Sequence, residues 1–211
     1  MRCSATVGLV LLAGTASPGD PDRESATDRV ALLIQQLGHD RYAKREEASR
    51  RLEAIGEPAL GPLRTAASHG DPEIRRRVEL VIQAIADNVT RRELKTLQGR
   101  WSLVSYETDG TRVKGEDMTH TFSVDGERWA ICVGGQVLQA GTVRRIERTG
   151  KVNAIDLLIT DGGGVGMTAE SIFAVEGESL KYLNSGHPRA TEFVTKPGDG
   201  RNYLTFHRAK R

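Results

Sequence analysis

The pattern of hydrophobic and polar positions divides the chain into two parts. From about residue 28 to 89, apolar residues recur at the spacing of one helix face, whereas beyond residue 97 they alternate with polar residues. A period of 3.6 indicates amphipathic helices, and a period of two indicates half-buried strands. The sequence therefore predicts an α+β multidomain protein, with helical hairpins over 28–89 and a β domain over 90–211.

The helical part contains four short apolar stripes separated by glycine and proline. In the first, Thr27 is a candidate N-cap before a stripe that runs from Val30 to Leu37. In the last, Asp71 is the candidate cap and Pro72 occupies the first helical position, where proline is tolerated. We expect the helix that follows to bury a face that ends near Ile85.

Four short helices with tight corners resemble a pair of HEAT-like repeats. The resemblance covers roughly residues 28–88 and is carried by Ala48–Gly56 and by Asp71–Ile85. Repeat units bury their faces against neighbours, and about three are usually needed for stability. The resemblance therefore implies that these units dock on the second part of the chain or on a protein partner.

The β part is predicted to be an antiparallel meander joined by turns such as Asp125-Gly126 and Gly134-Gly135. The expected strands span 101–108, 120–124, 128–133, 137–147, 154–160, 167–175, 179–184, 190–195 and 203–208. Such a sheet must hide its edges, and closure into a barrel does so. The residues expected to face inward are Trp101, Leu103, Phe122, Val124, Ile131, Leu157, Phe173 and Leu204.

The entry to this domain is similar to that of lipocalins. A short helix is expected over 91–97, and Gly99-x-Trp101 follows it at the first strand. The resemblance implies that Trp101 plugs one end of the barrel and that a basic residue of the last strand covers it. Arg208 is placed in the sequence to do so, through a cation–π contact.

The resemblance extends along nearly all of residues 94–209. Its segments are LQGRWSLVSYETDG, AIDLLITDG, LKYLNSG, PRATEF, KPGDG and YLTFHR. In this order they resemble a lipocalin-like domain family found in planctomycete bacteria. Membership implies the lipocalin-like β-barrel fold and the origin, and it implies no reaction.

The sequence leaves open whether the barrel is hollow or filled, because eight strands either hold one small ligand or fill with side chains. A hollow barrel predicts a non-enzymatic binding module for a small apolar ligand, and a filled one predicts a structural scaffold. The candidate ligand-binding residues are Trp101, Phe122, Trp129, Phe173 and Tyr182. The candidate residues of a loop at the barrel mouth are His187, Arg189 and Glu192.

The net charge and the absence of known motifs argue against binding of nucleic acid, cofactors or metal ions. Lys+Arg 30 against Asp+Glu 28 leaves a net charge of +2, and Glu73 and Glu79 flank the run Arg75–Arg77, so no nucleic-acid partner is expected. The glycine-rich run 161–166 lacks a P-loop lysine, and the five histidines lack metal-ligand spacing, so we expect no cofactor and no metal.

A small hydrolase is the least favoured alternative. Ser185 and His187 lie two residues apart, but no Gly-x-Ser-x-Gly turn surrounds the serine and no orienting acid is evident. We therefore predict no catalytic residue, and whether the protein is an enzyme stays open.

The N-terminus has the order of a secretory signal peptide. Arg2 precedes an apolar run over 7–12, and small residues continue through Ser17. This predicts a signal peptide over 1–17, a linker over 18–27 and an exported protein, periplasmic or extracellular. The apolar run is too short for a membrane span. Cys132 is then the one cysteine of the mature chain.

Overall fold

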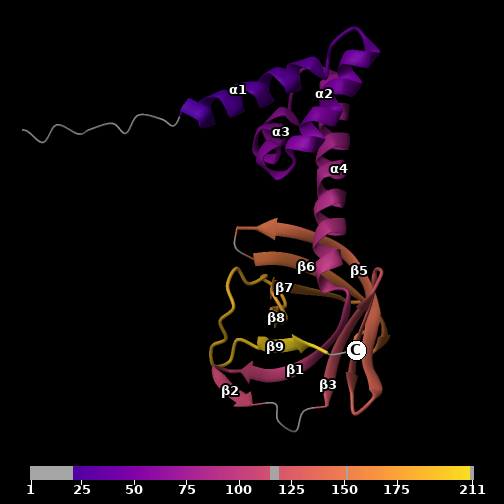
Figure 1. The fold of residues 1–211 in the computed structure, drawn as a ribbon, viewed down its shortest axis with the longest axis vertical. Helices are drawn as coiled ribbons and strands as arrows, with labels where there is room; N and C mark the ends of the chain where they lie inside the picture. Colours follow the sequence, from indigo (N-terminus) through magenta and orange to yellow (C-terminus); the bar gives the residue numbers. More distant parts are fainter. Residues whose placement is uncertain (1–20, 115–118, 151, 210–211) are drawn as a thin grey trace, which may run out of the picture. The chain divides into compact units, whose positions relative to one another are not determined.

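The computed structural model describes residues 21–114, 119–150 and 152–209, and the chain divides into two compact units at Val81/Ile82 (Figure 1). The predicted signal peptide lies outside the described residues. The helices are α1 Pro21–Gln36, α2 Tyr42–Ile55, the 3-10 helix Glu57–Ala59, α3 Leu60–Ala66 and α4 Pro72–Leu97. Within the described ranges, no helix is both long and apolar enough to cross a membrane.

Two helix boundaries differ from those expected. Helix α1 begins at Pro21, so Thr27 and the last part of the expected linker lie within the helix. Helix α4 is continuous over 26 residues, in place of separate helices over 71–85 and 91–97. No glycine or proline stands between those two segments to interrupt it. The expected cap at Asp71 is confirmed, since its Oδ1 accepts a hydrogen bond from the Glu73 N–H at 2.8 Å.

The helical unit repeats one corner with an offset of 30 residues. At the end of α1, the His39 Nδ1 accepts a hydrogen bond from the Arg41 N–H, and the Arg45 guanidinium donates to the His39 carbonyl. At the end of α3, the His69 Nδ1 accepts from the Asp71 N–H, and the Arg75 guanidinium donates to the His69 carbonyl. Buried positions follow the same offset: they include Leu33 and Leu63, and Ala48 and Val78.

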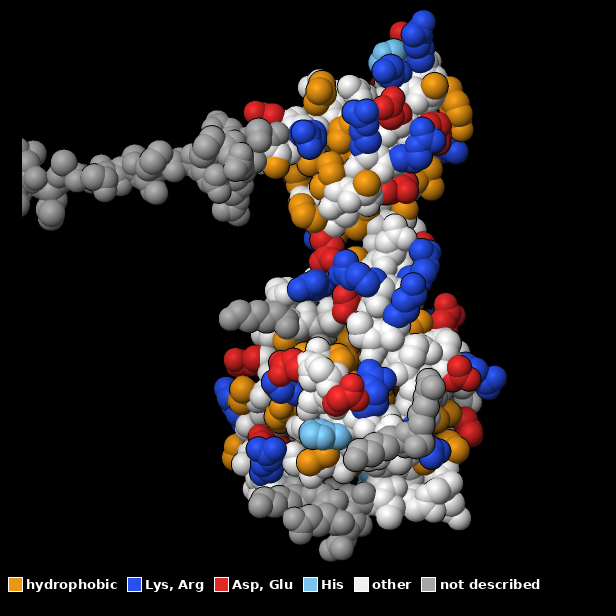
Figure 2. Space-filling view, in the orientation of Figure 1, with side chains coloured by type: hydrophobic (Ala, Val, Ile, Leu, Met, Phe, Trp, Pro, Cys, Tyr) orange, Lys and Arg blue, Asp and Glu red, His pale blue; other side chains and the backbone are white. Residues whose placement is uncertain are grey.

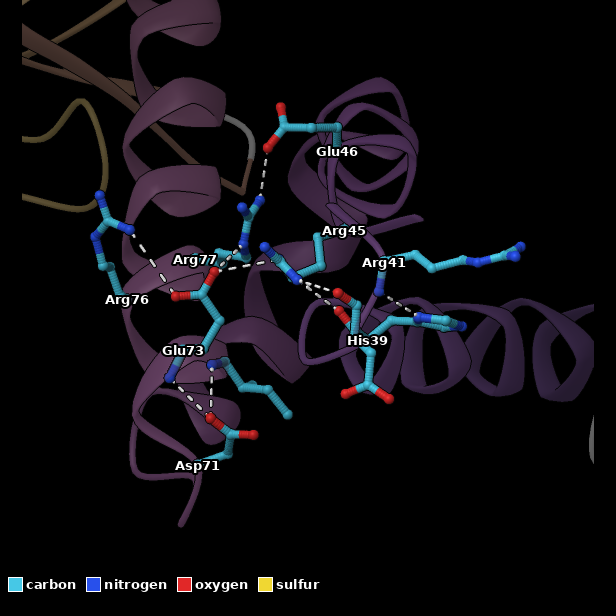
Figure 3. Close-up of polar contacts among 10 residues, drawn as sticks. His39, Arg41, Arg45, Glu46, Asp71, Glu73, Arg76 and Arg77 are labelled. Carbon is cyan, nitrogen blue, oxygen red and sulfur yellow. Dashed lines mark hydrogen bonds and ion pairs between the residues drawn. The ribbon is translucent and has the colours of Figure 1, made fainter. Parts of the chain in front are cut away.

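Arg77 is a charged residue of this unit whose side chain is buried, at 8% exposure (Figure 3). Its Nε donates to Glu73 Oε1 at 2.6 Å and its Nη1 donates to Glu46 Oε1 at 2.8 Å. These hydrogen bonds hold the pKa of both carboxyls below the usual 4.5. On the face drawn in Figure 2, Lys and Arg side chains of the helical unit are interspersed with Asp and Glu.

The second unit is a closed antiparallel β-barrel of eight strands, entered from the end of α4 (Figure 1). Its ring contains β1 Gly99–Thr108, β3 His120–Asp125, β4 Arg128–Val133, β5 Gln136–Thr149, β6 Val152–Gly162, β7 Thr168–Glu176, β8 Ser179–Asn184 and β9 Asn202–Arg208. Each strand pairs with the next, and β1 closes the ring by pairing with β9 from Trp101↔Arg208 to Thr108↔Asn202.

A ninth strand, β2 Thr111–Lys114, is not one of the eight strands of the ring. It pairs with residues 105–108 of β1, whereas β3 pairs with residues 99–102. Both lie along the same edge of β1, so β2 occupies the place beside β1 where β3 ends. The sequence did not predict β2. The prediction of a strand over 190–195 is wrong, because this segment is irregular in the structure.

The barrel interior holds one apolar core, and a smaller cluster lies elsewhere on the barrel. All eight residues expected to face inward belong to the core or pack against it. The smaller cluster joins Val152, Ile172 and Leu183 to Ala190 of the segment between β8 and β9. Ile172 lies between Ser171 and Phe173, and Phe173 belongs to the core, so this cluster lies on the outer face. Ala190 thereby anchors its segment to the outside of the barrel.

Candidate functional site: the barrel cavity

The interior of the barrel is hollow at one end. A cavity of about 460 Å³ lies there, lined mainly by apolar and aromatic side chains. The lining residues are Leu103, Tyr106, His120, Phe122, Trp129, Ile131, Leu138, Gln139, Leu157, Ala169, Tyr182, Asn184, Asn202, Leu204 and Phe206. Leu138 and Asn184 are exposed, so the cavity reaches the surface where these residues lie.

Trp101 and Arg208 lie together at the opposite end of the barrel. Trp101 is fully buried, and its Nε1 donates to the Leu97 carbonyl at 2.8 Å. The Arg208 guanidinium lies over the indole ring, 4.1 Å from its centroid, and donates to the carbonyls of Gln98 and Thr96. Arg208 therefore covers the tryptophan and also binds the free carbonyls at the end of α4.

Four of the polar residues that line the cavity lie toward its open end. Inward positions along a strand are two residues apart. His120 is therefore the next inward position to Phe122 on β3, and Asn202 is the next to Leu204 on β9, in each case on the side away from Trp101. Asn184 on β8 pairs directly with Asn202. We call Tyr106, His120, Asn184 and Asn202 the polar ring; within it, the Tyr106 hydroxyl donates to Asn202 Oδ1 at 3.1 Å.

A buried hydroxyl pair lies deeper. Tyr182 lines the cavity, and its hydroxyl is 2.7 Å from the Ser171 hydroxyl. Burial raises the pKa of Tyr182 to about 12, and its hydrogen bond with Ser171 partly offsets this rise. The phenol therefore stays neutral at physiological pH and presents no charge to the cavity.

Two buried ring nitrogens among the lining residues have no hydrogen-bond partner in the described part of the chain. They are His120 Nδ1, in the polar ring, and Trp129 Nε1. The Trp129 nitrogen lies beside Gly141, where an added Cβ would approach it to 3.0 Å. A buried polar group without a partner is costly, so the His120 nitrogen is a position at which a bound molecule can gain a hydrogen bond.

The structure divides the predicted ligand-binding residues. Phe122, Trp129 and Tyr182 line the cavity together. Trp101 and Phe173 do not; both are fully buried in the core and contribute no wall. Alternation along a strand indicates which residues face inward, but it does not say which end of the interior is filled.

The predicted barrel-mouth residues are placed differently from the expectation. Arg189 forms an ion pair with Asp156 on β6, and His187 Nδ1 lies 3.4 Å from Glu170 Oε2 on β7. Asp156 follows the inward-facing Ile155, so it points outward. His187, Arg189 and Glu192 are absent from the cavity lining, because Ala190 packs against the outer cluster and holds this segment on the outer face.

The serine considered for a hydrolase is engaged elsewhere. The Ser185 hydroxyl donates to the Glu170 carbonyl at 2.9 Å, and His187 is 89% exposed. This arrangement gives the serine no base as a hydrogen-bond partner.

Sequence reasoning missed the polar ring. The alternation that identified Phe122 and Leu204 as inward-facing also predicts His120 and Asn202, each two residues earlier on the same strand. Tyr106 does not follow this rule, because a bulge at Val104 shifts the register between Leu103 and Ser105.

Comparison with known proteins adds no relative to this description: no family model, curated protein or solved structure matches the chain.

Proposed function

We propose that the protein is a non-enzymatic binding module whose barrel holds one small, mainly apolar molecule. The observation that carries the proposal is the cavity of about 460 Å³, lined by Leu103, Phe122, Ile131 and Leu204 among others. Binding sites for small molecules are concave and mostly apolar, with a few placed polar groups. The scaffold alternative requires a filled barrel, and this volume favours binding instead.

The test is a titration of the purified full-length chain with the fluorescent apolar amine N-phenyl-1-naphthylamine, followed by native mass spectrometry for copurified molecules. Ala169 lines the cavity, so Ala169→Phe places a ring in the space that the probe needs. Ala130 lies between the inward-facing Trp129 and Ile131, so Ala130→Phe adds the same ring to the outer face.

We expect saturable probe binding that weakens about tenfold in Ala169→Phe and is unchanged in Ala130→Phe. Circular dichroism confirms that both variants keep the β-sheet content. If the wild-type chain does not bind the probe, the proposal is refuted. Equal binding by both variants also refutes it, because the probe then binds outside the cavity.

We also propose a structural relationship for each of the two parts of the chain. We infer a lipocalin-like barrel, with Trp101 and Arg208 as its plug, and a relationship to the lipocalin-like domain family of planctomycete bacteria. We also infer that residues 28–89 form HEAT-like repeats; the matched corners at His39 and His69 support this. Export through cleavage near residue 17, and a protein partner on the helical face, stay predictions.

A further inference from the structure

We infer that the ligand of the barrel is an uncharged amphiphile, whose apolar part fills the cavity and whose neutral hydrogen-bonding end lies at the polar ring. The inference rests on the proposed function and adds the chemical class of the ligand. Three observations support it: the charge of the lining, the distribution of its polar groups and the unpartnered nitrogen of His120.

The first observation is the absence of fixed charge. Among the described residues that line the cavity, none is Lys, Arg, Asp or Glu. An ion taken out of water into an apolar site needs a counter-charge or several hydrogen bonds, since desolvation otherwise outweighs what it gains. A fatty-acid anion and an alkylammonium ion therefore both fit this cavity worse than a neutral molecule of the same length.

The second observation is the separation of apolar and polar groups along the barrel axis. Toward the plug the walls are apolar, with Leu103, Phe122 and Phe206 in the core cluster. At the open end, the polar ring brings together a phenol, an imidazole and two carboxamides. A molecule with one polar end matches this arrangement in one orientation, with its tail toward Trp101.

The third observation is the hydrogen-bonding capacity of the ring. His120 Nδ1 is buried and has no partner among the described residues, whereas the Tyr106 hydroxyl and Asn202 Oδ1 already bond to each other. An imidazole nitrogen donates or accepts according to its tautomer. A hydroxyl group does both, so an alcohol satisfies His120 in either tautomer.

The experiment is displacement of bound N-phenyl-1-naphthylamine by three molecules that each have a straight chain of ten carbon atoms. They are decan-1-ol, decanoate and decyltrimethylammonium, compared at about pH 8, where the carboxylate is ionised. Decan-1-ol is used below its solubility limit, and the two ions are used below the concentrations at which they form micelles. We expect decan-1-ol to displace the probe at a concentration at least tenfold below that of either ion.

His120→Leu tests the polar end, because it keeps much of the side-chain volume and removes the ring nitrogen. His207 is exposed and lies between the inward-facing Phe206 and Arg208, so His207→Leu is the matched control on the outer face. We expect His120→Leu to weaken decan-1-ol about three- to tenfold, in line with the loss of one hydrogen bond. Probe affinity should change less than twofold in His207→Leu, and the displacement by decan-1-ol is calculated in each variant from the probe affinity measured for that variant.

The outcomes separate the two proposals. If the wild-type chain does not bind the probe, the proposed function fails. If the probe binds but decanoate or decyltrimethylammonium displaces it as well as decan-1-ol, the binding function stands and the neutral class is wrong. If His120→Leu leaves decan-1-ol unaffected, the ligand's polar end does not lie at the polar ring, and this inference is likewise overturned.

Discussion

Replacing Arg208 with alanine tests how the closed end of the barrel is held. The substitution removes the guanidinium from the face of Trp101 and frees the carbonyls of Gln98 and Thr96 at the end of α4. It also removes a contact with Glu178 at 3.4 Å, which is too exposed to contribute much. The indole keeps its own hydrogen bond to Leu97.

The size of the effect follows from these contacts. A cation–π contact contributes about 0.5–2 kcal/mol, and a hydrogen bond from a charged donor about 1.5–3 kcal/mol when it is shielded from water. The bond to Gln98 is partly buried and the bond to Thr96 is exposed, so only the first counts in full. We expect Arg208→Ala to lower the free energy of unfolding by about 2–4 kcal/mol, since such contributions overlap.

Urea unfolding followed by tryptophan fluorescence measures this loss. Both tryptophans, Trp101 and Trp129, belong to the barrel unit, so the signal reports on the barrel. The expected shift of the midpoint is about 1–2 M urea. Arg100 is an exposed arginine on β1, and Arg100→Ala should change stability by less than about 0.5 kcal/mol. A loss for Arg208→Ala as small as that of this control refutes the plug.

Three further predictions concern other parts of the molecule. Arg45→Ala and Arg75→Ala should each destabilise the helices by about 1–2 kcal/mol, measured by circular dichroism in urea; a loss confined to one of them contradicts equivalent corners. The lowered pKa of the two glutamates bound to Arg77 stabilises the helical unit above pH 4.5, and this is lost as the pH falls below those values; Arg77→Met should flatten this acid dependence of the same urea midpoint. Because Tyr182 keeps its proton to about pH 12 when folded, the urea midpoint by fluorescence should drop as the pH rises from 10 toward 12, and Tyr182→Phe should drop less. An unchanged pH profile in either variant contradicts the assigned group.

The sequence predicted the barrel well because alternation is a local property. The strands expected over 128–133 and 179–184 have the observed bounds. The segment 190–195 has a similar alternation but lacks a strand beside it, and Ala190 packs on the outer cluster instead. Pairing partners, which decide whether such a segment becomes a strand, are not encoded in its own pattern.

The site was less predictable than the fold. Alternation places Phe173 and Tyr182 on the inside equally, yet only Tyr182 borders the cavity. Which end is hollow depends on the total volume of the side chains that all eight strands place there. The sequence of a single strand does not determine this total. The outward position of Arg189 depends on a distant carboxylate, Asp156, which spacing along the chain does not reveal.

The order of strands around the barrel also bears on how the chain folds. Every pairing in the ring joins strands that follow one another along the chain, apart from β1 with β3, between which β2 intervenes, and the seam between β1 and β9. Hairpins can therefore form locally, and one long-range step remains, the closure that brings Trp101 beside Arg208. Loop-closure entropy grows slowly with length, by about 0.6 kcal/mol for each doubling. The connections between strands, such as the glycine-rich one over 163–167, can therefore lengthen during evolution at little cost to folding. Binding properties can diversify there while the ring stays the same.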